Sequence, residues 1–201
     1  IAPTTDLPAF DHYYNCSDQA IGHHIVFVPY APIDMAGSSY ATNTNNIMWN
    51  TTATNQGTST QANPYLNSNL HKWELGEYLG KLPSKLQGYL LNHRSLCESR
   101  YSASGNLNAS TGWAWADLGK IWSPSEMEVY GCCACGTMQW SQGMDSQFPL
   151  FRETKNRIMG GRVNWWLRVV SGSSASNVCN VNNNGNANNN SATNTNVRPR
   201  P

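Results

Sequence analysis

The chain has 201 residues, which suits one domain of ordinary to large size. A formal net charge of +1 argues against non-specific electrostatic binding of nucleic acid. No apolar run is long enough to predict a membrane-spanning segment. Charged residues make up only 12% of the chain, and eight Trp and nine Tyr residues offset this. We therefore expect an aromatic-rich core under a polar, mostly uncharged surface.

The N-terminal third of the chain predicts little regular structure. Residues 1–21 lack the basic and apolar regions of a signal peptide and an initiator Met, so we interpret them as an N-terminal extension or linker of a processed product or fragment. The apolar stretch "GHHIVFVPY" over 22–30 predicts a buried strand that Pro29 closes. Residues 36–63 are mostly Ser, Thr, Asn, Gly and Gln, which predicts a long polar loop.

Two helices are expected next. Residues 63–83 carry apolar side chains at helical spacing, and Gly80 and Pro83 would end that helix. Residues 82–93 predict a shorter amphipathic helix, with Ser84 as its candidate N-cap and with Leu86, Tyr89 and Leu90 on its buried face. A strand is expected over 94–103.

The strongest capping signal in the chain is "SPSEMEVYG". Ser123 as the N-cap, Pro124 at the first helical position and Glu126 at the third would form a capping box. The helix would run to about Tyr130 and end at Gly131, whereas residues 132–163 look irregular.

The C-terminal part of the chain predicts strands. Residues 164–170, "NWWLRVV", form one strand, in which Trp165 and Trp166 point to opposite faces and at least one is in the core. The Asn184-Gly185 pair predicts a two-residue hairpin turn, and "NVR" predicts a final strand at an edge. The overall pattern is that of an α+β fold without a domain boundary.

Catalytic motifs are not found in the sequence. His23 and His24 would face opposite sides of a strand, and Glu126 and Glu128 are too close in sequence to face each other on a helix. The six cysteines leave three alternatives open, namely inert buried thiols, a disulfide, or a metal site with unusual spacing. We expect no enzyme activity, no metal and no cofactor.

Asparagine dominates residues 171–196, which contain no charged residue. The residues between the asparagines are small or β-branched, which favours a hairpin-containing scaffold over a disordered tail. We expect the Val and Trp side chains to face inward and eleven Asn side chains to face outward: Asn177, Asn180, Asn182, Asn183, Asn184, Asn186, Asn188, Asn189, Asn190, Asn194 and Asn196.

The frame "WWLR…VRP", with "SEMEVYG" and "LCESRYSASG" upstream, resembles the variable proteins of diversity-generating retroelements over about residues 22–201. The resemblance implies a C-type-lectin-like domain with two helices, a small twisted antiparallel sheet and long structured loops. These retroelements mutate template adenines, and AAC and AAT codons encode Asn. The eleven asparagines are therefore interpreted as variable positions in their template state, within a variable region of about 171–196.

The resemblance also implies a function. We expect a non-catalytic domain that binds a host cell-surface protein or glycan through its variable positions. It would be displayed with other virion proteins on a phage tail or capsid, or alternatively on a bacterial cell surface. The scaffold residues would be Trp165, Trp166, Arg168 and Arg198, with each arginine hydrogen-bonded to a carbonyl or carboxylate.

Two alternatives remain open. The same domain could be a structural or decoration domain of a capsid or tail protein. A hydrolase or sulfatase-activating type of enzyme on this fold class is the third hypothesis, although the sequence gives it no supported Cys pair or metal site. Calcium is not expected in the variable region, because residues 171–196 contain no carboxylate.

Overall fold

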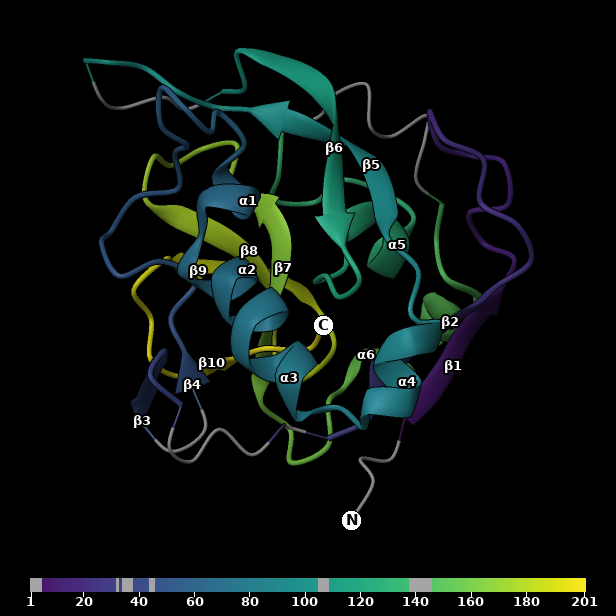
Figure 1. The fold of residues 1–201 in the computed structure, drawn as a ribbon. Coiled ribbons are helices and arrows are strands. Elements are labelled where there is room, and N and C mark those ends of the chain that lie inside the picture. Colours follow the sequence, from purple (N-terminus) through teal and green to yellow (C-terminus); the bar gives the residue numbers. More distant parts are fainter. Residues whose placement is uncertain (1–4, 32, 34–37, 44–45, 105–108, 138–145) are drawn as a thin grey trace.

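The computed structural model describes residues 5–31, 33, 38–43, 46–104, 109–137 and 146–201. These residues form a mixed α+β fold with several short helices and small sheets, of which the largest is a curled four-stranded half-barrel (Figure 1). The expected α+β class is confirmed. None of the described helices is long and apolar enough to cross a membrane.

The four-stranded sheet holds the C-terminal part of the chain. Its central strand β7 (Asn164–Val170) has the bounds expected from the sequence. On one side it pairs in parallel with β10 (Val197–Arg198), and on the other it pairs in antiparallel fashion with β8 (Asn177–Val181). The strand β9 (Ala187–Ser191) completes the order β10-β7-β8-β9, so the short final strand lies at an edge as expected.

Strand β7 separates two apolar cores. Trp165 and Leu167 pack into one core, while Trp166 and Val170 pack into the other. Both indoles are fully buried, so the expectation that the two face opposite sides is confirmed. The Trp166 indole donates to the Ile47 carbonyl at 2.9 Å, which ties the polar segment before the first helix to this strand.

The N-terminal segment packs on the domain rather than trailing from it. Strand β1 (Thr5–Phe10) pairs in antiparallel fashion with β2 (Ile25–Pro29), and Tyr13 is buried in the core. The expectation of a buried strand over 22–30 holds for one face of β2 only, since Ile25 and Phe27 are each 46% exposed. The polar loop contains two short paired strands, β3 (Ala41–Asn43) and β4 (Asn46–Ile47).

The helix expected over 63–83 is broken into several pieces. Ser68 has extended backbone angles, so it ends one helix, and its hydroxyl accepts the His71 N–H at 3.0 Å and caps the next. The pieces are α1 (Pro64–Asn67), α2 (Asn69–Trp73), a π-helix η1 (Glu74–Tyr78) and α3 (Leu79–Lys81).

The second helix, α4 (Ser84–Tyr89), forms with a different cap and a different face from those expected. Pro83 occupies the N-cap position, and no side chain caps the helix. Tyr89 is 73% exposed and Leu86 is 39% exposed, so the expected buried face is wrong. Only Leu90, just beyond the helix, packs against the core.

An antiparallel hairpin follows, of which the sequence indicated only the first strand. Strand β5 (His93–Ser99) pairs with β6 (Gly112–Gly119) along its whole length. Residues 132–163, expected to be irregular, contain a short 3₁₀-helix η3 (Pro149–Arg152) and a helix α6 (Thr154–Arg157).

The capping box lies two residues later than expected. Ser125 is the N-cap of α5 (Glu126–Tyr130), and Glu128 is its reciprocal partner. Ser123 lies two residues before the cap, and its hydroxyl instead donates to the buried Glu74 carboxyl group at 2.6 Å. The expected end of the helix is confirmed, since Gly131 adopts a left-handed φ of 73°.

A buried ion pair joins α5 to β7. The Arg168 guanidinium donates to both Glu128 oxygens, at 2.6 and 2.9 Å. The Tyr13 hydroxyl and the Ser125 N–H donate to the same carboxylate. Burial alone would raise the pKa of Glu128, but Arg168 and these hydrogen bonds hold it below its usual value.

The Glu128→Gln variant should lose about 3–5 kcal/mol of stability, because Arg168 would remain buried without its counter-charge. Urea unfolding at neutral pH measures this loss. The exposed Glu153→Gln variant is the matched control and should change the stability by less than about 0.5 kcal/mol. Equal stability of the two variants would contradict this role of the ion pair.

A second buried carboxyl gives a pH-dependent prediction. Burial raises the pKa of Glu74 to about 8, although Ser123 and Tyr65 donate to it. Between pH 4.5 and 8 the unfolded chain therefore releases a proton that the folded chain retains, and stability falls as the pH rises.

Because Gln cannot ionise, the stability of Glu74→Gln relative to the wild type should increase from pH 5 to pH 8, by at most about 1.4 kcal/mol per pH unit. Denaturant unfolding at intervals of one pH unit measures the difference. Glu77→Gln is the control and should differ from the wild type by a constant amount over this range. A constant difference for Glu74→Gln as well would disprove the assignment.

Candidate binding surface

The eleven asparagines expected to be variable, here called the Asn surface, lie on the β8–β9 hairpin and the loop after it. Most of these side chains reach the surface in part or in full. The exposed ones are Asn183, Asn184, Asn186 and Asn196, and the half-buried ones are Asn177, Asn182, Asn188, Asn189, Asn190 and Asn194.

Asn180 departs from the expected outward orientation. Its side chain is fully buried, and neither its amide nitrogen nor its amide oxygen has a partner among the described residues. In the register of the sheet it stands opposite Trp166, and it shares a strand face with Val178. Because side chains alternate along a strand, this position must face the Trp166 core.

The Asn surface wraps around the edge strand β9. Asn177 donates its side-chain amide to the Asn189 oxygen at 2.8 Å on one face of the hairpin. Asn188 and Asn190 alternate to the other face, where Asn194 donates to the Asn190 oxygen at 3.2 Å. The two faces and the loop tip thus present different groups of asparagines, so one flat partner contacts only part of the surface.

The turn of this hairpin differs from the expected two-residue type. Asn182 and Asn186 close a three-residue loop, and the Gly185 N–H donates to the Asn182 carbonyl at 2.9 Å. Gly185 has a φ of 81°, whereas Asn184 does not have a positive φ. The geometry is that of a turn followed by a left-handed glycine bulge, which places only Gly185 in the left-handed region.

Two of the asparagines close turns with their side chains. The Asn182 side-chain oxygen accepts the N–H groups of Asn184 and Asn186 at 2.9 and 3.0 Å. The Asn194 oxygen accepts the Asn196 N–H at 2.7 Å. Short polar side chains commonly stabilise turns in this way. By contrast, no hydrogen bond is found for four side chains within the described residues: Asn183, Asn186, Asn188 and Asn196.

Residues distant in sequence fix the base of the hairpin. The buried Arg100, just after β5, donates to the carbonyls of Ser171 and Ser174 at 2.8 and 3.1 Å. The buried Asn55 donates to the carbonyls of Ser174 and Asn177 at 2.8 and 2.6 Å. Sequence reasoning missed both residues: Arg100 lies within the quoted stretch "LCESRYSASG" but nothing local indicates its partners, and Asn55 lies in a polar loop without a motif.

The expected scaffold residues lie beneath this surface. Trp165 and Trp166 fill the two cores, and Arg168 bonds to the Ser123 carbonyl at 3.2 Å as well as to Glu128. The expectation that Arg168 binds carbonyls and carboxylates is confirmed. Arg198 is half-buried in β10, where it is paired with Trp165 in the register.

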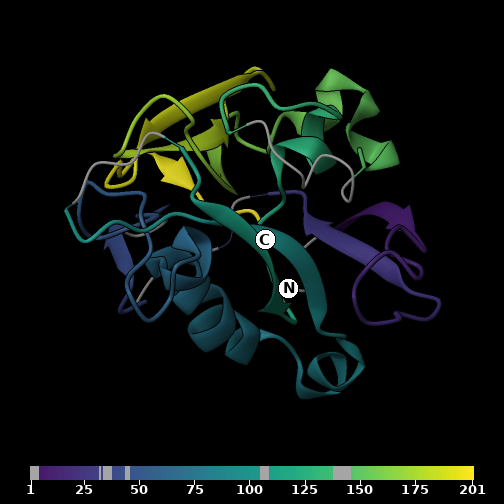
Figure 2. The ribbon, with the colours of Figure 1, turned by 90° about the horizontal axis from the view of Figure 1, so that it is seen from above.

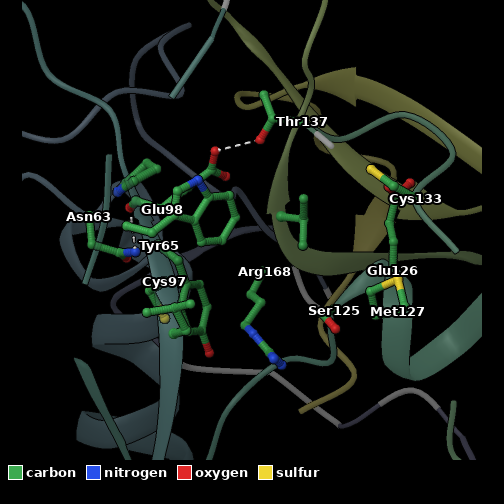
Figure 3. A pocket seen from close by; sticks show the side chains of 14 residues that line it. Asn63, Tyr65, Cys97, Glu98, Ser125, Glu126, Met127, Cys133, Thr137 and Arg168 are labelled. Carbon is green, nitrogen blue, oxygen red and sulfur yellow. Dashed lines mark hydrogen bonds between the residues drawn. The ribbon is translucent and has the colours of Figure 1, made fainter. Parts of the chain in front are cut away.

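A second candidate site is the small pocket between β5, α5 and β7 (Figure 3). Tyr65 and Glu98 lie on one side of it, Glu126 and Cys133 on the other, and Arg168 between them. Burial raises the pKa of Glu98, whose carboxyl accepts the Thr137 hydroxyl at 2.9 Å.

The Glu126 carboxylate has a structural role, although Glu126 is not the residue that completes the capping box. Its carboxylate accepts the backbone N–H groups of Ala134, Cys135 and Gly136 at distances of 2.9–3.2 Å. Its acceptor capacity is therefore used to hold the cysteine-rich loop against α5. The prediction that Glu126 completes a capping box is wrong, because Glu128 is the partner of the Ser125 cap.

The cysteines are all thiols in the structure. Burial raises the pKa of Cys135 and of the fully buried Cys179, so both are neutral at physiological pH. The described residues contain no group of three side chains suited to hold a metal ion. The geometry therefore favours the first of the three alternatives for Cys179, an inert buried thiol.

Comparison with known proteins places the chain in a family. No curated protein and no solved structure shows significant similarity to it. A family model does match, over residues 38–201, which include every element from β3 to β10 and all of the Asn surface. Because this match spans most of the chain, the protein belongs to the family described as Domain of unknown function (DUF6273).

Proposed function

We propose that the protein is a non-catalytic ligand- or receptor-binding domain of the C-type-lectin-like type. Its Asn surface is the diversified site of a diversity-generating retroelement, and the domain is displayed on a phage virion or, alternatively, on a bacterial cell surface. The partners would be a host cell-surface protein or glycan and other virion proteins.

One observation carries the proposal: four of the asparagines take no part in holding the hairpin. Asn183, Asn186, Asn188 and Asn196 make no hydrogen bond through their side chains in the described structure. The fold depends instead on residues elsewhere, such as Trp166, Arg100 and Asn55. These four positions should tolerate substitution without loss of fold, as a binding surface on a rigid scaffold requires.

The chemistry of asparagine explains why the present form is a weak binder in this proposal. Amide side chains offer hydrogen bonds but little apolar area, and interface energy is concentrated in aromatic and arginine side chains. Mutation of Asn codons at their adenines yields Tyr, Ser, Asp, Gly and other residues. Tyr would supply the large, rigid contact area that the unmutated surface lacks.

A structural or decoration role is the second candidate, and a different surface favours it. Phe10, Ile25 and Phe27 share one face of the β1–β2 ribbon, and Phe10 is 68% exposed. Exposed apolar residues in a contiguous group are typical of packing interfaces. This ribbon lies away from β9 (Figures 1 and 2), so attachment through the ribbon and binding at β9 are compatible.

A display library tests the proposed binding function. We expect randomisation of Asn183, Asn186, Asn188 and Asn196 to yield micromolar or better binders of an immobilised test protein such as lysozyme, enriched in Tyr, Trp and Arg. The unmutated chain should show no detectable binding. The control library varies exposed helix positions: Lys72, Lys81, Ser84 and Lys85. Equal yields from the two libraries would argue against a dedicated binding surface.

The turn geometry predicts which asparagines cannot vary freely. Asn182→Ala removes the oxygen that accepts two turn N–H groups and should destabilise the domain by about 1 kcal/mol. Asn183→Ala is the matched control in the same loop and should change stability by less than about 0.5 kcal/mol. Thermal unfolding of both variants measures the difference, and an equal effect would show that Asn182 is as replaceable as its neighbour.

A further inference from the structure

The tip of the hairpin rests on helix α6. A Cβ atom added to Gly185 would lie 2.9 Å from the Thr154 carbonyl oxygen and 3.3 Å from the Arg157 Cβ. Only glycine allows so close an approach of the two backbones, and its φ of 81° is also left-handed. The loop tip and the segment 152–162 therefore form one continuous surface.

Arg162 reaches from this segment to the Asn surface. Its guanidinium Nη2 donates to the Asn184 side-chain oxygen at 2.8 Å, and both residues are exposed. Arg162 also has a φ of 52°, a left-handed conformation that is uncommon for a residue with a long side chain. Such conformations persist where the surrounding structure or a function maintains them.

The segment around Arg162 is basic, in contrast to the uncharged hairpin. It contains Arg152, Lys155, Arg157 and Arg162 against the single acid Glu153. Glu153 is already paired with Lys155 at 2.6 Å, and the Arg157 guanidinium lies over the Tyr130 ring. Within the described residues no carboxylate lies within 4.0 Å of the Arg162 guanidinium.

We infer that Arg162 is an unvarying contact residue at the hairpin tip and that it binds a carboxylate side chain of a protein ligand. The inference rests on the proposed binding function of the Asn surface. Arginine is among the residues that dominate interface energy, and its planar fork matches a carboxylate in a bidentate manner. Asn183, Asn184 and Asn186 beside it would then adjust the fit to each partner.

Arg162 would be a constant contact on a surface whose asparagines differ between diversified copies. Arg162 lies outside residues 171–196, so diversification of that region leaves it in place. Its donors point at the tip, where Asn184 accepts one of them, and the remaining N–H groups of the guanidinium are available to a ligand. Ligands of different diversified copies would therefore share an acidic group at this point.

A pair of synthetic peptides tests the inference by NMR titration of the ¹⁵N-labelled protein. The probes are acetyl-Ala-Glu-Ala-Glu-Ala-amide and the same peptide with Gln in place of Glu. We expect the Glu peptide to shift the signals of the Arg162 Nε and of the amides of Asn183 to Asn186. The Gln peptide should bind about fivefold more weakly, which corresponds to one exposed charge contact of about 1 kcal/mol.

Two variants complete the test. Arg162→Asn suits the left-handed backbone, so the domain should fold with an unchanged melting temperature and lose the preference for the Glu peptide. Lys72→Gln removes a cation on α2 and should leave the preference intact. Equal shifts with both peptides, or a preference that survives Arg162→Asn, would overturn the inference while leaving the library test of the Asn surface unaffected.

Discussion

The buried contact between Arg168 and Glu128 connects most parts of this molecule. It joins the central strand β7 to α5, and the same carboxylate accepts the Ser125 N–H of the capping box and the Tyr13 hydroxyl of the N-terminal segment. Two buried charges cost desolvation energy that only good geometry and further hydrogen bonds can offset. Here both oxygens of the carboxylate are bonded, and the pair therefore fixes strand, helix and N-terminal segment in one arrangement.

Other buried ionisable side chains hold irregular segments of the chain through hydrogen bonds. Four glutamates are buried, and each holds a different piece of irregular chain: Glu74, Glu98, Glu126 and Glu128. Arg100 does the same for the Ser171–Ser174 loop, and Arg200 donates to the Pro29 carbonyl at 2.8 Å and lies over the Trp165 ring. Several of the few ionisable residues in this chain are thus buried, where hydrogen bonds in a low dielectric are strong. These contacts hold long loops in place without regular secondary structure.

The structure gives a physical reason for some of the asparagines and not for others. Asn182 and Asn194 close turns through their side chains, so their identity has a physical reason within this fold. Asn183, Asn186, Asn188 and Asn196 have no such reason in the described structure, which suits the proposal that their codons rather than their side chains account for them. Asn180 fits neither explanation, because an amide without a partner in the Trp166 core costs about 1–3 kcal/mol. The structure gives no physical account of this residue.

Sequence alone determined those features that depend on neighbours along the chain. Alternation along residues 164–170 placed Trp165 and Trp166 on opposite faces, and the left-handed preference of Gly131 ended α5 at the expected residue. Tertiary contacts decided the rest. The capping box formed at Ser125 and Glu128, whereas the Ser123 hydroxyl donates to the distant Glu74, and pairing with β7 placed Asn180 opposite Trp166. The donors from Arg100 and Asn55 were likewise invisible in the sequence, because a hydrogen bond between residues about 70 to 120 positions apart leaves no local pattern.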